Sequence, residues 1–161
     1  MANVAALRTA QTLGVLGLLP FSALALLTWL PESATLGQRA IVPLAQWALV
    51  AYAALILSFL GAVHWGFVLR APSMPPRLMR QSLAWGVIPS LLGWLALLMI
   101  FVGVAPSLAF AFLIADLVLV RVMDGALLRE SAVPANGYLE LRTRLTVGAS
   151  LALAVALAAS L

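Results

Sequence analysis

The stretch from Ala40 to Leu69, AIVPLAQWALVAYAALILSFLGAVHWGFVL, decides the fold of this chain. It holds no Asp, Glu, Lys or Arg, and about 20 apolar residues in a helix suffice to cross the roughly 30 Å hydrocarbon layer of a bilayer. We therefore expect a transmembrane helix over residues 42–69 that is long enough to tilt or to protrude. The chain's only histidine, His64, lies inside this helix, so its role in lipid is the main question that the sequence raises.

The composition of the whole chain is that of an integral membrane protein. Of its 161 residues, 65% are hydrophobic and 9% charged, and the mean hydropathy is +1.13, far from the values of soluble domains. No room is left for a separate soluble domain. Without cysteine, and with a single histidine, the chain has no thiolate or histidine-rich set of metal ligands and no pair of histidines for a haem. We expect no metal site and predict no cofactor.

Three further uncharged stretches, Thr9–Pro31, Gln81–Ala115 and Leu145–Leu161, supply four more spans. The expected architecture is an all-α bundle of five transmembrane helices in one domain, residues 1–161. Gly103 and Pro106 divide one long apolar stretch, because glycine favours a helix C-terminus and proline a first turn. The spans are expected near residues 10–30, 42–69, 82–103, 106–123 and 143–161. The first could instead be a secretory signal, but its length and Pro20 favour a retained helix.

The arginines predict how the bundle is oriented. All but one of the nine basic residues fall at the ends of spans that lie on the N-terminal side, and only Arg39 falls on the other. Because basic loop residues favour the cytoplasmic side, we expect the N-terminus inside and the C-terminus outside. The net charge of +4 flanks apolar spans instead of forming a basic stripe, so nucleic acid is not an expected partner. The expected partner is the lipid bilayer.

Small residues recur every four positions in two spans. Such tracks let helix backbones approach closely, which replaces the hydrophobic force that lipid removes. We expect both tracks to face other helices, of the same chain or of another copy. Their members are Ala54, Ser58, Ala62 and Gly66 in the second span, and Gly148, Ala152, Ala156 and Ser160 in the fifth.

A G-x-x-P pattern occurs in the first span, Gly17 to Pro20, and in the third, Gly86 to Pro89. Proline removes a backbone hydrogen bond inside a helix, and glycine lets a neighbouring helix approach the resulting kink. We expect kinks at both places. An old duplication of a helical hairpin and chance recurrence both explain the pattern.

Two polar residues are expected at matched depth in the membrane. His64 lies six residues before Arg70 and Asp116 five before Arg121, which places them about 9 and 8 Å inside the same boundary at about 1.5 Å per residue. Because a buried carboxylate normally has a partner, Asp116 is the expected partner of His64. Arg121 is expected to extend to the headgroups near Asp124, which leaves Asp116 as the one buried acidic residue.

Three interpretations of His64 stay open. It can be a neutral histidine bonded between helices, part of a proton-handling pair with Asp116, or a contact for a quinone or haem. Gly61, about one turn earlier, would leave room there for another backbone or a small ligand.

Several segments together resemble a known family. They are LGLLPFSALAL, AYAALILSFLGAVHWGFVLR, an intramembrane Asp followed by Arg, and NGYLELRTRLTV. The chain resembles the domain of unknown function 3429 family, whose members include transmembrane protein 69-like proteins. The resemblance implies a small multi-pass protein of the bacterial inner membrane and no established reaction. The family pattern falls on Pro20, Gly61, His64, Trp65, Gly66 and Asp116, and Ala62 stands where glycine is expected.

Two functions follow as alternatives. The first is a non-enzymatic accessory or assembly factor that packs its helices against other inner-membrane proteins or against itself. The second is a small transporter, or a proton-handling, quinone-binding or haem-binding protein, that uses His64 and Asp116. No catalytic triad, phosphate loop or catalytic carboxylate pair is visible, so an enzyme is the weakest of the possibilities.

Overall fold

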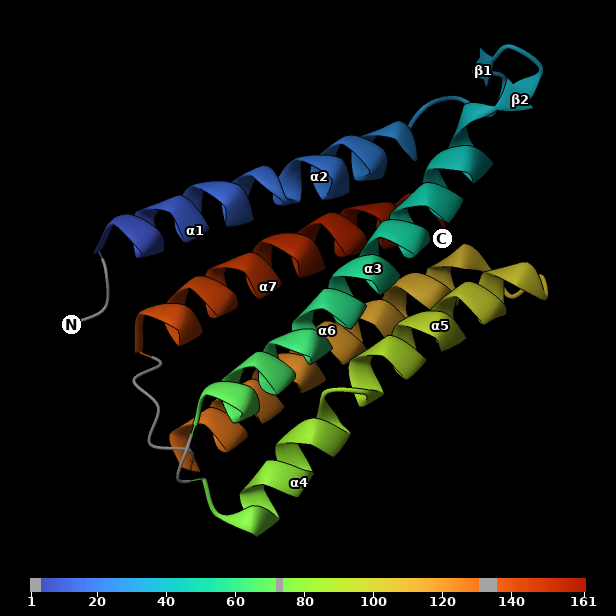
Figure 1. Ribbon diagram of the computed structural model, residues 1–161. Helices are drawn as coiled ribbons and strands as arrows, with labels where there is room; N and C mark the ends of the chain where they lie inside the picture. Colours follow the sequence, from blue (N-terminus) through green and yellow to red (C-terminus); the bar gives the residue numbers. More distant parts are fainter. Residues whose placement is uncertain (1–3, 72–73, 131–135) are drawn as a thin grey trace.

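The computed structural model describes residues 4–71, 74–130 and 136–161 and is almost entirely helical (Figure 1). A short antiparallel hairpin follows the first two helices, with Thr35 opposite Ala40 and Leu36 opposite Arg39. The elements are α1 (Val4–Leu16), α2 (Leu18–Leu27), β1 (Thr35–Leu36), β2 (Arg39–Ala40), α3 (Ile41–Arg70), α4 (Pro76–Trp85), α5 (Ile88–Phe101), α6 (Pro106–Glu130) and α7 (Asn136–Ala158).

These helices confirm the five expected spans. Five segments are long and apolar enough to cross a membrane: Arg8–Leu27, Ile41–Arg70, Pro76–Phe101, Pro106–Arg129 and Gly137–Ala158. Three of them differ from the prediction by six residues at one end: the third begins at 76 instead of 82, the fifth at 137 instead of 143, and the fourth ends at 129 instead of 123. The sequence places these ends at charged side chains, whereas the helices continue past them, since a continuous helix keeps its backbone groups hydrogen-bonded.

Two of the five spans are broken, and both breaks fall at the G-x-x-P pattern. Gly17 separates α1 from α2, and Gly86 lies between α4 and α5. Pro20 and Pro89 each lie in the first turn of the helix that follows the break, where a missing N–H is tolerated. Proline therefore starts a new helix segment here, and the span bends without losing an internal hydrogen bond at that residue.

The α3 helix runs through the bundle in contact with α2, α4, α5 and α6. Its closest approach is to the broken span α4–α5, at two glycine contacts. A Cβ added to Gly93 would lie 3.0 Å from the Cα of Ala54, and one added to Gly61 would overlap the carbonyl oxygen of Gly86. The two contacts are seven residues apart on both partners, which is about two helical turns, so the backbones of these antiparallel spans stay close over that distance.

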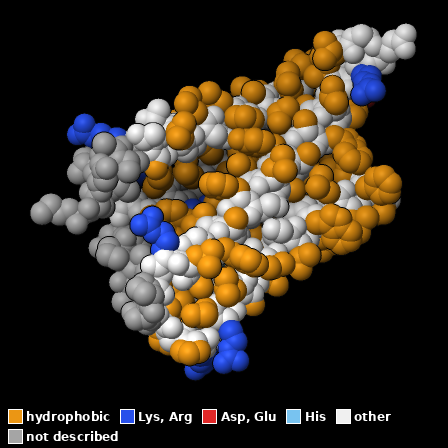
Figure 2. Space-filling model, in the orientation of Figure 1, with side chains coloured by type: hydrophobic (Ala, Val, Ile, Leu, Met, Phe, Trp, Pro, Cys, Tyr) orange, Lys and Arg blue, Asp and Glu red, His pale blue; other side chains and the backbone are white. Residues whose placement is uncertain are grey.

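Apolar side chains fill the bundle and also cover its outside. The buried core includes Phe21, Leu49, Leu57, Phe110 and Leu153. Figure 2 shows hydrophobic side chains over the visible flank, whereas arginine side chains gather at the end where α1 begins and α4 lies, with one more near the β1–β2 hairpin. A surface that is apolar along its flank and basic at one end suits a protein surrounded by lipid.

Candidate functional site

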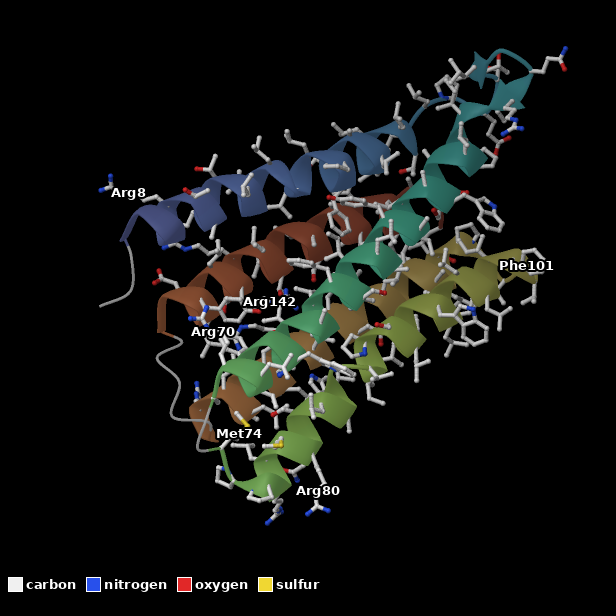
Figure 3. The ribbon with its side chains drawn as sticks, in the orientation of Figure 1. Arg8, Arg70, Met74, Arg80, Phe101 and Arg142 are labelled. Atoms are coloured by element: carbon white, nitrogen blue, oxygen red, sulfur yellow. The ribbon has the colours of Figure 1, made fainter. Side chains whose placement is uncertain are left out.

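A buried cluster of three charged or titratable side chains lies between α3, α6 and α7. The Nε2 of His64 lies 2.8 Å from Oδ1 of Asp124, and Nε of Arg142 donates to Oδ2 of the same carboxylate at 3.0 Å. Because an ionised carboxylate can only accept, Nε2 of the imidazole is the donor. The exposed fractions are 2% for His64, 1% for Asp124 and 4% for Arg142. Figure 3 labels Arg142, which comes from α7.

The partner of His64 is thus Asp124, which corrects the expectation of Asp116. The sequence-based depth assumes that Arg70 and Arg121 both mark the membrane boundary. In the structure α6 continues past Arg121 to Glu130, so Arg121 does not mark the end of this helix. Asp116 lies eight residues before Asp124, about 12 Å along the axis, and is too far along the helix to be level with the histidine.

Arg121 also departs from its expected place beside Asp124. Its Nε donates to Oγ1 of Thr143 at 2.7 Å, across the contact between α6 and α7. Asp124 faces the bundle instead and takes Arg142 as its cation. The sequence did not reveal this pair, because Asp124 is followed by Gly125 and Asp-Gly is typical of a turn, whereas α6 continues through both residues.

Arg142 is only partly satisfied by its protein partners. Besides the bond from Nε to Asp124, Nη1 donates to Oγ1 of Thr146 at 3.0 Å. The third nitrogen, Nη2, is buried and has no hydrogen-bond partner among the described residues. The same holds for Oδ2 of Asp116 and Nε1 of Trp85. An unsatisfied buried donor on a cation is costly, so Nη2 is the atom of this cluster with most to gain from a ligand.

A pocket of about 410 Å³ adjoins the cluster, between α1, α2, α3 and α7. Most of its lining is apolar and includes Phe21, Leu60 and Val63. Arg142 lines the same pocket, as do Tyr138 and Thr146. The pocket therefore combines a large apolar volume with a few polar groups that gather near Arg142, which is the usual composition of a site for a small amphipathic molecule.

The predicted small-residue track of α3 faces two directions. Ala54 is buried and Ser58 half-buried, but Ala62 and Gly66 are exposed, with nothing within 4 Å of a Cβ added to Gly66. A helix turns once every 3.6 residues, so positions four apart drift by about 40° at each step. The track consequently leaves the bundle interior after Ser58. Gly61, seven residues after Ala54, holds the internal contact instead.

The remaining predicted residues lie around the broken spans and along α7. A Cβ on Gly86 would lie 2.6 Å from Cδ1 of Trp65, so the indole covers the break, and Pro89 is buried beside it. Gly17 accepts a hydrogen bond at its carbonyl oxygen from the hydroxyl of Tyr52, at 2.9 Å. On α7, Gly148 lies against Leu18 of α2, and Ala152 and Ala156 are buried.

The histidine and carboxylate of the cluster are engaged with each other and with Arg142. Within the described ranges, no three His, Asp or Glu side chains come together. Hydrogen bonding by Nη2 of Arg142 is the chemistry that the cluster offers to a molecule in the pocket.

Comparison with known proteins agrees with the sequence resemblance. The model of a family described as "Protein of unknown function (DUF3429)" matches residues 6–158. Transmembrane protein 69 of Xenopus tropicalis is 39% identical over 98 residues, which is 56% of this chain and 33% of the relative. The chain thus aligns with about a third of that relative's length. No solved structure matches the chain.

Proposed function

Since the chain belongs to the DUF3429 family, which brings no activity with it, we propose from the site alone that it binds a small amphipathic molecule taken up from the bilayer. One observation carries this proposal: buried Arg142, whose Nη2 has no hydrogen-bond partner in the part of the chain that the structure describes, lines a large apolar pocket. The chain is a multi-pass membrane protein, so its ligands reach such a pocket through lipid.

The size and lining of the pocket support the proposal. Its volume of about 410 Å³ falls within the roughly 300–1,000 Å³ of small-molecule sites. Phe59, which is 66% exposed, and the exposed Leu13 are among its lining residues, so the pocket reaches the lipid-facing surface. An aliphatic chain would contact these walls while a polar head lay at Arg142.

Mass spectrometry of small molecules extracted from the purified protein tests this function. Ala10 is exposed and lines the pocket, so Ala10→Trp fills it; Ala23 is equally exposed on α2 but lies outside the pocket, so Ala23→Trp is the matched control. We expect the unaltered protein and Ala23→Trp to retain the same organic molecule at near one per chain, and Ala10→Trp to lose it. Equal amounts in all three proteins, or no bound molecule in any, would refute the proposal.

An accessory or assembly role is the second candidate, and the outward face of α3 favours it. Ala62 and Gly66 leave an open, small-residue surface toward the lipid, where a helix of another protein or a second copy could pack closely. In that case Gly66→Leu would change the set of co-purifying membrane proteins or the oligomeric state. Val118→Leu, at a site on α6 that is 49% exposed, would change neither.

We further propose that the protein lies in a bacterial inner membrane with its N-terminus in the cytoplasm. Apart from Arg39 on β2, the basic residues support this orientation by their gathering at one end of the bundle. The cysteine-free chain allows a direct test. A membrane-impermeant maleimide added outside should label Gln38→Cys in the hairpin and should leave Glu140→Cys near the start of α7 unlabelled.

A further inference from the structure

The charges of the buried cluster also indicate what kind of head group the pocket accepts. We infer that the ligand presents an uncharged oxygen acceptor, such as a carbonyl of an ester or a quinone, to Nη2 of Arg142. This inference rests on the proposed function, because it concerns the head group of the molecule in the same pocket.

Hydrogen-bonding geometry selects Nη2 as the group that contacts the ligand. Two of the three guanidinium nitrogens of Arg142 are already engaged, Nε by Asp124 and Nη1 by Thr146. His64 holds the other oxygen of the Asp124 carboxylate. The guanidinium plane is therefore fixed from two sides, and Nη2 is left as a donor with no acceptor among residues 4–71, 74–130 and 136–161. Asp124 and His64 are positioning residues that act through Arg142.

Charge balance then decides between a neutral and an anionic head group. The guanidinium of Arg142 already has a counter-ion in Asp124, so with a neutral imidazole the cluster carries one positive and one negative charge. On the pocket wall, the uncharged hydroxyl of Tyr138 interacts with the guanidinium of Arg142 and adds no charge to the cluster. An anion would therefore enter a buried site without a free cation, which is expensive in an apolar medium, unless His64 took up a proton. A neutral acceptor satisfies Nη2 and leaves the balance unchanged.

Three amphiphiles of equal chain length separate these possibilities: dodecane, methyl dodecanoate and dodecanoate. Their binding would be measured as the ligand-dependent shift of the thermal unfolding midpoint of the purified full chain in a non-ionic detergent. A pH of 8 keeps the carboxylate ionised, since its ordinary pKa is about 4. A hydrogen bond to a charged donor strengthens binding by about one order of magnitude or more. We therefore expect methyl dodecanoate to bind about tenfold or more tightly than dodecane, and dodecanoate more weakly than the ester.

Each other outcome has a distinct meaning. No shift with any of the three compounds refutes the proposed function, and with it the head-group inference. Equal shifts with dodecane and the ester would agree with binding in the pocket but would refute recognition of the head group by Arg142. A larger shift with dodecanoate than with the ester would show that the pocket prefers an anionic head group. That result refutes the head-group inference and leaves the proposed function standing.

Charge-altered variants test the inference independently of pocket shape. Asp124→Asn removes the counter-ion of Arg142, so we expect the preference to invert toward dodecanoate, an effect that a loss of packing alone would not produce. Should that variant fail to fold, the double variant Asp124→Asn with Arg142→Gln keeps the cluster neutral. In this double variant the ester should bind less than tenfold more tightly than dodecane. If the ester kept its full preference over dodecane, the role of Arg142 would be refuted.

Discussion

Replacing Gly61 with alanine tests the closest helix contact in the bundle. The added Cβ would overlap the carbonyl oxygen of Gly86 and lie 3.1 Å from its carbonyl carbon and 3.5 Å from Cδ of Pro89. These are backbone and ring atoms, so no flexible side chain can move away, and α3 must separate from the α4–α5 span. Overpacking of this kind costs about 1–3 kcal/mol, against a gain of at most about 1 kcal/mol from alanine's helix propensity.

The net loss expected for Gly61→Ala is therefore about 1–2 kcal/mol, which lowers the unfolding midpoint by about 2–8 °C for a chain of this size. Gly66→Ala is the matched control, because it lies on the same helix with nothing within 4 Å of its added Cβ. It should unfold at or slightly above the midpoint of the unaltered protein. Thermal unfolding in detergent, followed by tryptophan fluorescence, measures both. If Gly61→Ala proves as stable as Gly66→Ala, the backbone contact at Gly86 is not as close as we describe.

Three further substitutions probe the polar groups inside the bundle. Asp124→Asn should destabilise the protein by about 3–5 kcal/mol, because it leaves Arg142 buried without its counter-ion; a denaturant titration would contradict this if the midpoint stayed unchanged. Asp116→Asn should leave stability unchanged or raise it by the same assay, since it replaces a buried ionisable carboxyl, whose Oδ2 has no partner among the described residues, by an uncharged amide. Tyr52→Phe should cost about 1 kcal/mol through the lost bond to Gly17, and a thermal midpoint within error of the unaltered protein would show that this bond adds nothing.

The number of spans and the places where they break followed from the sequence, because both depend on local chemistry. Apolar length sets the spans, and the G-x-x-P patterns at Gly17 and Gly86 set the breaks. The prediction that the small-residue track on α3 faces other helices of the chain was wrong beyond Ser58, for a geometric reason. Its four-residue spacing is not the period of a helix, so the true contact face passes through Gly61 instead.

The cluster around Asp124 could not be obtained by the same reasoning. Sequence-based depth treats every arginine as a boundary marker, although Arg142 is buried and α6 runs on past Arg121. Which carboxylate meets His64 depends on the register between α3 and α6, and that register is fixed by packing along the whole interface. The sequence identified the histidine and placed interest on a buried acid, but only the packing of α3, α6 and α7 supplies the arginine, and α1 and α2 complete the pocket.

The cost of the cluster is itself an argument for binding. A buried ion pair often adds little stability, and well-packed apolar side chains of similar volume can replace it without loss. A bundle that needed only close packing would therefore gain nothing from His64, Asp124 and Arg142 in its interior. Arg142 lines a pocket of about 410 Å³, and its Nη2 has no acceptor within the described ranges. The cluster is accounted for if that nitrogen is held for a ligand. Asp124 then has two roles. Its carboxylate offsets the charge of Arg142 inside the membrane, and its hydrogen bond to Nε fixes the direction in which Nη2 points.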